Sequence, residues 1–272
     1  MPFFLFCGAF LLLPVVFLVV GSFQDAKGAL TAQNYVDVVT VPKVVNDFLL
    51  SIEISLVTAA GGVVFGFLLA YAIILGGLPA FLRDTLMTFS GVASNFAGVP
   101  LAMAFIFTLG QTGLVTIFLR DTFHIGLYQN GFSLYSKLGL EIVYMYFQFP
   151  LMVLIIAPAI DGLKKDWREA AENLGATSVD YWRRVALPIL MPSLLGAGIL
   201  LFGNAFGAQA TAYQLTGGLL PLITIDISNQ ISGDVLHNVG LGYAMAVSMV
   251  VIMSIAIGGY LLLQRKTERW MR

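Results

Sequence analysis

Six side chains that can donate and accept hydrogen bonds stand inside long apolar stretches of the sequence. They are Ser94, Asn95, Tyr144, Gln148, Asn204 and Gln209. Tyr144 and Gln148 are four residues apart, which places both on one face of a helix. Such groups are costly in hydrocarbon and therefore mark candidate functional positions. They either line a hydrophilic path for a solute or hydrogen-bond between helices and hold a bundle together.

Residues suited to covalent catalysis or metal binding are scarce in this chain. The two histidines, His124 and His237, stand near the ends of predicted helices, without a carboxylate cluster or a G-x-S-x-G sequence beside them. We interpret both as solvated loop residues and expect neither a catalytic site nor a metal site. No G-x-x-x-x-G-K-[ST] phosphate loop is present, so we expect no cofactor on this chain and ATP on a separate subunit.

The composition places this chain in a membrane. Hydrophobic residues make up 58% of the sequence and charged residues 11%, whereas soluble domains carry about 25% charge. The formal net charge of −1 gives no reason to expect a nucleic-acid partner. The single cysteine, Cys7, excludes an internal disulfide framework.

The apolar stretches predict an all-α membrane protein with six spanning helices in a single domain, residues 1–272. The predicted spans are residues 2–23, 47–75, 85–109, 136–160, 189–212 and 242–263. Residues 24–46 and 76–84 are expected to be a loop and a tight turn. Residues 113–123 predict a helix too short to cross, which lies at the interface or re-enters.

An even number of spans places both termini on one side, together with the turn at 76–84 and the polar segment 161–188. Ten lysines and arginines fall on that side and four on the other. Positive charges gather on the cytoplasmic side of membrane proteins. The sequence therefore predicts cytoplasmic termini and a cytoplasmic 161–188 segment.

The segment 161–188 is a polar island in which ten of 28 residues are charged. Asp166 and Glu169 have the spacing of a capping box, which predicts a helix beginning at Trp167, and Gly175 is suited to end it. An apolar face is expected along this helix, formed by Trp167, Ala170, Ala171 and Leu174. Two helical turns are unstable alone in water, so this helix needs a surface on which to dock.

A second helix is predicted in the same segment. Thr177 or Ser178 is suited to cap it. Its expected apolar side carries Val179, Trp182 and Ala186, and Pro188 is expected to interrupt it.

The spacing of this segment resembles a known motif. Glu169-Ala170-Ala171 is followed after three residues by Gly175, after nine more by Val185, and then after one by Leu187-Pro188. This resembles the EAA loop of binding-protein-dependent ABC importer permeases, in which isoleucine usually stands where this chain has Val185. The alternative interpretation is an ordinary amphipathic loop helix between two spans.

The resemblance implies a MetI-like bundle in a bacterial inner membrane. It implies a cytoplasmic loop whose first helix fits a cleft on the ATP-hydrolysing subunit. The contact residues it implies are Trp167, Glu169, Ala170, Ala171, Leu174 and Gly175. It also implies a second permease, identical or different, and an extracytoplasmic solute-binding protein. Residues 204–218 and the outer loop around Tyr35 are similar to the branch that handles polyamines, thiamine, iron, sulfate or aminoethylphosphonate, which suggests a small, polyamine-like solute.

Two other classes of protein are compatible with an apolar multi-span chain. A stand-alone secondary transporter or channel would need no docking helix, but proton- or sodium-coupled carriers generally use an ionised residue at membrane depth. A membrane enzyme would need a catalytic constellation, and none is visible in the sequence.

Overall fold

The computed structural model describes residues 6, 8–25, 28–129, 131–232 and 238–268. The regular secondary structure of these residues is helical, apart from an isolated antiparallel bridge between Gln24 and Leu30. Five helices within the described residues are long and apolar enough to cross a membrane, and Gly8–Ser22 forms a shorter apolar helix. The predicted all-α, six-helix membrane architecture is therefore confirmed.

The chain forms two compact units. The first unit comprises Met1–Glu53 and Gly217–Ala256, and the second comprises Ile54–Thr216 and Ile257–Arg272. Two long helices, α4 (Pro42–Leu75) and α14 (Val239–Glu268), contribute residues to both units. Each unit is described by itself below.

The first unit contains η1 (Gly8–Leu12), α2 (Leu13–Ser22), α3 (Gln33–Thr40) and α13 (Ile223–Ser232). The buried amide of Asn34 donates hydrogen bonds of 2.9 Å to the carbonyl oxygens of Ser22 and Gln24, just beyond α2. The expectation that 24–46 is a loop is wrong for residues 33–40 and 42–46, which form α3 and the start of α4. Polar residues such as Asn34 occur in this stretch because they bond the backbone at the end of α2. The periodicity of apolar residues in the sequence does not detect such contacts.

An ion-pair cluster joins α4 to α13 within the first unit. Lys43 Nζ lies 3.1 Å from Asp47 Oδ2 and 2.5 Å from Asp226 Oδ1. Both aspartates are buried, while more than half of the lysine side chain is exposed. The second oxygen of each carboxylate has no hydrogen-bond partner among the described residues. A single lysine therefore compensates two buried carboxylates.

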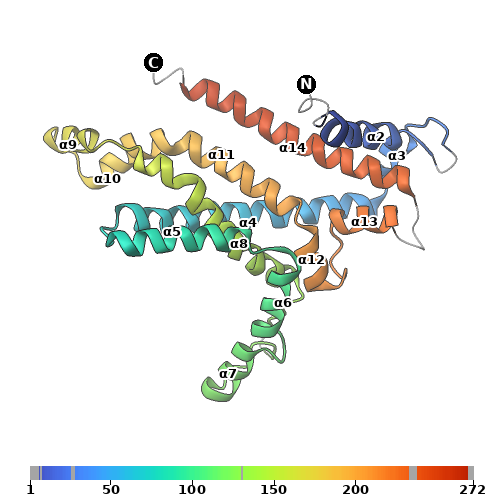
Figure 1. Cartoon of the computed structure of the whole chain (residues 1–272), viewed down its shortest axis with the longest axis horizontal. Coiled ribbons are helices and arrows are strands. Elements are labelled where there is room, and N and C mark those ends of the chain that lie inside the picture. The colour runs from blue at the N-terminus through green and yellow to red at the C-terminus, as the bar shows by residue number, and fades with distance from the viewer. Residues whose placement is uncertain (1–5, 7, 26–27, 130, 233–237, 269–272) are drawn as a thin grey trace. The chain divides into compact units, whose positions relative to one another are not determined.

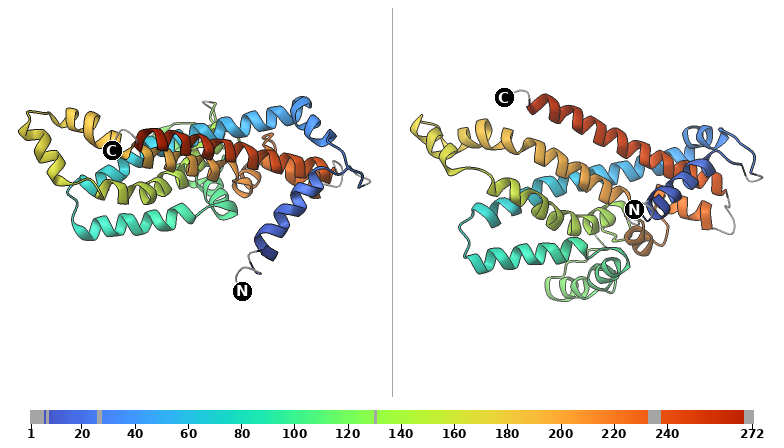
Figure 2. Two further views of the ribbon diagram at one scale, coloured as in Figure 1. Left: turned by 90° about the horizontal axis from the view of Figure 1, so that it is seen from above. Right: turned by 45° about the horizontal axis from the view of Figure 1, so that its top comes forward.

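The second unit is built around α8 (Lys137–Asp161), which lies beside α5 (Ala80–Asn95) and α11 (Leu187–Phe206) in both Figure 1 and Figure 2. Large apolar side chains follow one another along α8 at helical spacing and are fully buried. They include Leu140, Phe147, Met152, Ile156 and Ile160. Ser136 caps this helix by accepting a hydrogen bond from the Gly139 N–H. The fourth predicted span thus begins within one residue of the expected position.

Glycines on α4 allow the helix to approach α8 closely. A Cβ atom at Gly66 would lie 2.5 Å from Met152 Cβ, and one at Gly62 would lie 3.0 Å from Gln148 Cβ. Neither distance leaves room for a side chain. Small residues therefore set the separation of these helices, as is common where membrane helices pack.

The predicted span 85–109 is wrong as a single helix. The chain forms α5 and then α6 (Gly98–Leu109), followed by α7 (Leu114–Phe123). Ala97 is extended and Gly98 has φ +72, which no α-helix accommodates. The short helix predicted at 113–123 is confirmed as α7.

The predicted span 189–212 is also divided. Helix α11 ends at Phe206, and α12 (Gln209–Thr216) begins after Gly207 and Ala208. At its other end, α10 (Ser178–Tyr181) and the π-helical turn η2 (Trp182–Ala186) run directly into α11. The expected interruption at Pro188 is therefore wrong. The wider π turn before it accommodates the backbone hydrogen bond that proline cannot donate.

Candidate functional site

The helix of the polar island, α9 (Lys165–Asn173), begins two residues before the predicted position. Its N-cap is Lys164, which makes no side-chain capping bond, so the predicted capping box of Asp166 and Glu169 is wrong. Asp166 instead lies in the first turn, where a carboxylate interacts favourably with the helix dipole.

The C-terminal end of α9 is a Schellman motif centred on Gly175. The Gly175 N–H donates to the Glu172 carbonyl at 2.9 Å, and the Ala176 N–H donates to the Ala171 carbonyl at 3.0 Å. Gly175 has φ +79, so the predicted left-handed terminator is confirmed. This motif fixes the direction in which the chain leaves the helix.

The apolar face of α9 is only partly covered by the chain. Leu174 is 88% exposed, and no residue of α9 is buried. Glu169 and Ala170 are also exposed, whereas Trp167 and Ala171 are half-buried. An exposed apolar stripe on a two-turn helix matches the predicted need for an external surface.

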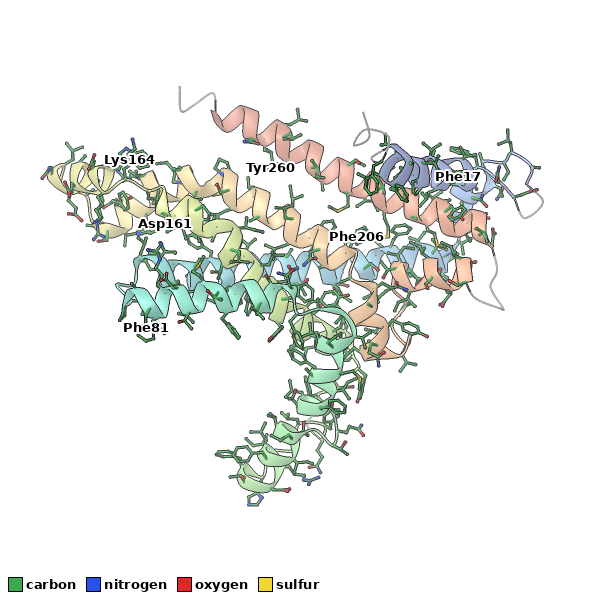
Figure 3. The ribbon with its side chains drawn as sticks, viewed as in Figure 1. Phe17, Phe81, Asp161, Lys164, Phe206 and Tyr260 are labelled. Carbon is green, nitrogen blue, oxygen red and sulfur yellow. The ribbon has the colours of Figure 1, made fainter. Side chains whose placement is uncertain are left out.

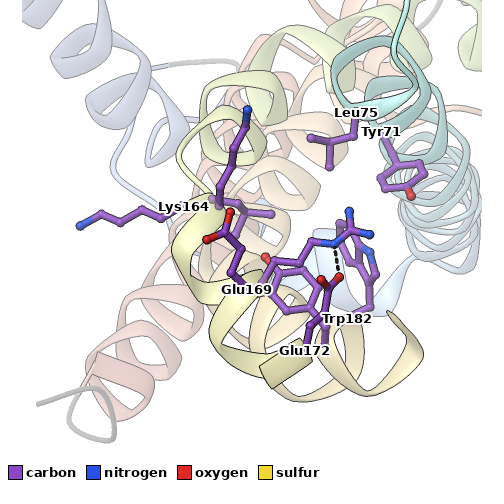
Figure 4. Close-up of a pocket in the computed structure, with 10 residues that line it drawn as sticks. Tyr71, Leu75, Lys164, Glu169, Glu172 and Trp182 are labelled. Carbon is purple, nitrogen blue, oxygen red and sulfur yellow. Dashed lines mark hydrogen bonds and ion pairs between the residues drawn. The ribbon is translucent and has the colours of Figure 1, made fainter. Parts of the chain in front are cut away.

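A hollow of about 380 Å³ lies beside α9, between this helix, the end of α4 and the start of the α10–η2 segment (Figure 4). Tyr71 and Trp182 form an aromatic wall, with ring centroids 5.2 Å apart. Across the hollow, Arg168 Nε lies 2.9 Å from Glu172 Oε1. This carboxylate raises the pKa of Arg168, so the guanidinium remains charged across the physiological range.

The second helix of the island is capped by a reciprocal pair of bonds. Thr177 Oγ1 accepts a hydrogen bond from the Asp180 N–H, and the Thr177 N–H donates to Asp180 Oδ2, both at 3.2 Å. This confirms Thr177 as one of the two predicted caps. The predicted apolar side is only partly correct, because Val179 is 74% exposed while Ala186 is buried.

Two of the six predicted path residues are anchored inside the second unit. The Tyr144 hydroxyl donates to the Ala208 carbonyl at 2.6 Å, and Gln148 Nε2 donates to the Leu201 carbonyl at 2.9 Å. Both side chains are buried. Gln148 Oε1 has no hydrogen-bond partner in the described part of the chain. These contacts join α8 to α11 and to the break that follows it.

The other four predicted path residues lie nearer the surface of the chain. Asn95 and Asn204 are exposed, and Ser94 and Gln209 are partly exposed. Ser94 and Asn95 both donate to the Gly91 carbonyl in the last turns of α5. Gln209 begins α12 rather than standing inside a long span. All four lie at or near the two helix breaks.

A contact between these breaks was not predicted. The Gly98 N–H, at the start of α6, donates to Thr211 Oγ1 at 2.8 Å. Thr211 is recognisable from the sequence as a polar residue in an apolar stretch. The Gly98-Val99-Pro100 sequence was the available signal for the break in the third span.

The histidines form no site that the structure describes. His124 is exposed and adopts a left-handed conformation (φ 55) at the end of α7. His237 lies outside the described residues. The described residues contain no group of three or more metal-ligating side chains.

Comparisons with solved structures show the fold. The chain superposes on a component of a bacterial ABC transporter that imports the acidic polysaccharide alginate with a TM-score of 0.74, at 16% identity, covering 100% of this chain and 94% of that chain. A chain of the MetNI methionine ABC transporter gives a TM-score of 0.55 at 16% identity, covering 82% of this chain and 95% of that chain.

Sequence comparisons identify the family. The sulfate transport system permease protein CysT of Salmonella typhimurium is 29% identical over 217 residues, 79% of this chain and 73% of that protein. The spermidine/putrescine permease PotB of Haemophilus influenzae is 31% identical over 139 residues, 49% of this chain and 47% of that protein. The model of the binding-protein-dependent transport system inner membrane components matches residues 51–269. Because this match spans both helix breaks and the whole polar island, the chain belongs to the family of inner membrane components of binding-protein-dependent transport systems.

Proposed function

We propose that this permease couples to a separate ATP-hydrolysing subunit through α9. The observation that supports this proposal is the partly uncovered apolar face of α9. Leu174, at the end of this face, is 88% exposed, and a Schellman motif fixes that end of the helix. A short helix is stable in this exposed position only if its ends are fixed and its face finds a partner. We assign the contact to Trp167, Glu169, Ala170, Ala171, Leu174 and Gly175.

The connections to α9 are short enough to carry movement. Three residues separate Asp161, the last residue of α8, from Lys165. The Leu163 N–H donates to the Ile160 carbonyl at 3.1 Å, which keeps this connection compact. Closure of an ATPase dimer would therefore displace α8 together with α9. In the assembly of two permeases, two ATPase subunits and an extracytoplasmic binding protein, this displacement would rock the helices between outward and inward access.

The docking test compares two carboxylates introduced one residue apart. Leu174→Glu places a charge on the apolar face of α9, and Asn173→Glu places the same charge beside that face. Both changes are equally unfavourable for the C-terminal end of the helix dipole. We expect Leu174→Glu to prevent co-purification of the ATPase subunit and Asn173→Glu to preserve it. Equal co-purification of both variants would contradict the proposal.

We assign the solute path to the surface around the two helix breaks, facing the second permease. Exposed amides at Asn95 and Asn204 can exchange hydrogen bonds with a hydrated solute. Irregular backbone at membrane depth is tolerated where it is buried in protein or lines a water-filled cavity. Tyr144 bonds the backbone of the break between α11 and α12, and Gln148 bonds α11 before that break.

We propose sulfate, or another small oxyanion, as the solute. The sequence suggested a polyamine-like solute, but the sulfate permease relative matches 79% of this chain whereas the spermidine/putrescine relative matches 49%. Amide and hydroxyl groups can donate hydrogen bonds to an oxyanion without a fixed charge. Uptake of labelled sulfate by the complete assembly, unaffected by excess spermidine, is the expected result. Uptake blocked by spermidine but not by unlabelled sulfate would contradict it.

The termini and the 161–188 segment are proposed to face the cytoplasm, in accordance with the distribution of basic residues. Asn173→Cys in a Cys7→Ser background provides a single label site on exposed α9. A membrane-impermeant maleimide should label it in inverted vesicles and leave it unlabelled in intact cells. Labelling in intact cells with an intact membrane would refute both the orientation and the docking proposal.

A further inference from the structure

One ion pair connects the first residue of the polar island, at the end of α8, to α5. Arg83 Nη2 lies 2.9 Å from Asp161 Oδ1 and 2.8 Å from Asp161 Oδ2. Arg83 belongs to the first turn of α5, and Asp161 is the last residue of α8. Figure 3 shows Phe81, also in the first turn of α5, at the same end of the second unit as Asp161.

Each of these charges is unfavourable for its own helix. The N-terminal end of a helix dipole repels a cation such as Arg83, and the C-terminal end repels an anion such as Asp161. Each charge is favourable only for the neighbouring helix, whose opposite end it approaches. The pair therefore cannot be explained as capping within α5 or within α8, and it is suited to join the two helices.

The location of the pair gives this junction a mechanical role. Asp161 is separated from α9 by three residues, and α5 packs along α8. A movement of α9 reaches the end of α8 first, and the ion pair passes it directly to the start of α5. Without the pair, the start of α5 would follow α8 only through apolar packing, which permits sliding.

The far end of α5 leads to the proposed solute path. This helix ends at Asn95, and after the break the Gly98 N–H is bonded to Thr211 Oγ1 on α12. A displacement along α5 therefore acts on the contact between the two helix breaks. The Asp161–Arg83 contact lies at the start of α5, and the Gly98–Thr211 contact lies three residues beyond its end.

We propose that Arg83 and Asp161 are positioning residues that transmit the movement of α9 to α5 and so to the break at residues 96–97. This inference rests on the proposed docking of the ATPase subunit on α9. It assigns a role to two residues outside the EAA-type motif. A continuous series of contacts does not by itself establish energetic coupling, so the test pairs a variant that removes the ion pair with one that restores it in reverse.

The test uses the complete assembly reconstituted in liposomes and measures labelled solute taken up per ATP hydrolysed. We expect Arg83→Ala to lower this ratio about two- to fivefold, as the loss of an exposed ion pair allows. The charge-swapped variant Arg83→Asp/Asp161→Arg should restore it, because the ion pair forms again in reverse, each charge then suiting its own helix dipole in place of the neighbouring one. Arg120→Ala, which removes the exposed Arg120–Asp121 pair on α7, is the matched control and should leave the ratio unchanged.

Each outcome decides the inference. An unchanged ratio in Arg83→Ala, or a swapped variant as defective as Arg83→Ala, overturns it. If Arg83→Ala does not accumulate in the membrane, the swapped variant decides: a wild-type ratio supports transmission, whereas a low ratio or a failure to accumulate overturns it. A purely structural pair would change the amount of protein and leave solute uptake per ATP unaltered.

The failure of this inference is distinguishable from the failure of the proposed function. If Leu174→Glu releases the ATPase subunit and Arg83→Ala keeps the wild-type ratio, docking is correct and transmission through the pair is wrong. If Leu174→Glu retains the ATPase subunit, the docking proposal itself is wrong.

Discussion

The hydroxyl of Tyr144 on α8 donates a 2.6 Å hydrogen bond to the carbonyl oxygen of Ala208, which lies in the break between α11 and α12. Ala208 immediately precedes α12 (Gln209–Thr216), so its carbonyl is the N-cap carbonyl of that helix. The Tyr144 hydroxyl therefore ties α8 to the break between α11 and α12.

Tyr144→Phe should destabilise the chain by about 0.6–2 kcal/mol, because it removes the hydrogen bond that joins α8 to the α11–α12 break. Thermal unfolding of the detergent-purified chain measures this loss. Tyr146→Phe is the control, since Tyr146 packs by its ring against Phe96 and Phe105. Equal unfolding temperatures for the two variants would show that the Ala208 bond contributes nothing.

Gly175→Val should disrupt the end of α9 at a cost of about 1–2 kcal/mol, because a β-branched residue is strained at φ +79. An added Cβ meets no atom within 4 Å, so the effect would come from the backbone alone. We expect normal amounts of permease in the membrane but loss of ATP hydrolysis stimulated by the binding protein. Gly91→Ala, near the end of α5 with equal open space, should leave stimulation intact.

Gly66→Ala should destabilise the second unit by about 1–3 kcal/mol, because the new methyl group would overlap Met152. Gly258→Ala on α14 is the matched control, since the same methyl group meets no atom within 4 Å there. Thermal unfolding of both variants gives the comparison. A Gly66→Ala variant as stable as Gly258→Ala would mean that α4 and α8 can separate without loss.

Lys43→Met should destabilise the first unit, because it leaves the buried carboxylates of Asp47 and Asp226 without a cation. The expected loss is about 1–3 kcal/mol, below the value for a fully buried pair because the lysine is half-exposed. Adding Asp226→Asn should recover part of the stability. Unfolding temperatures that are unchanged in Lys43→Met, or lowered further in the double variant, would contradict this assignment.

The membrane class, the number of apolar helices and the position of α9 were predictable because each depends on local composition or spacing. Gly175 is an example: a left-handed terminator follows from its place after the amphipathic run. The predicted capping box of Asp166 and Glu169 was wrong because the helix begins earlier, with Lys164 as its N-cap. A local pattern cannot reveal how the preceding helix directs the chain.

The two helix breaks were harder to predict because an uninterrupted apolar stretch is compatible with one long helix or two short ones. The breaks depend on partners distant in sequence, namely Tyr144 for Ala208 and Thr211 for Gly98. The same applies to Arg83 and Asp161, which are 78 residues apart. Such pairs become visible only when the packing of α5 and α8 is known.

The most direct test of α9 docking replaces Trp167 with a photoreactive benzoyl-phenylalanine and irradiates the assembled transporter. Trp167 lies on the apolar face of α9 and is partly exposed, so the probe should lie at the proposed contact with the ATPase subunit. We predict a cross-link to the ATPase subunit that is lost when Leu174→Glu is introduced as well. Cross-links confined to the permease or to lipid, in an assembly that still imports its solute, would contradict the account.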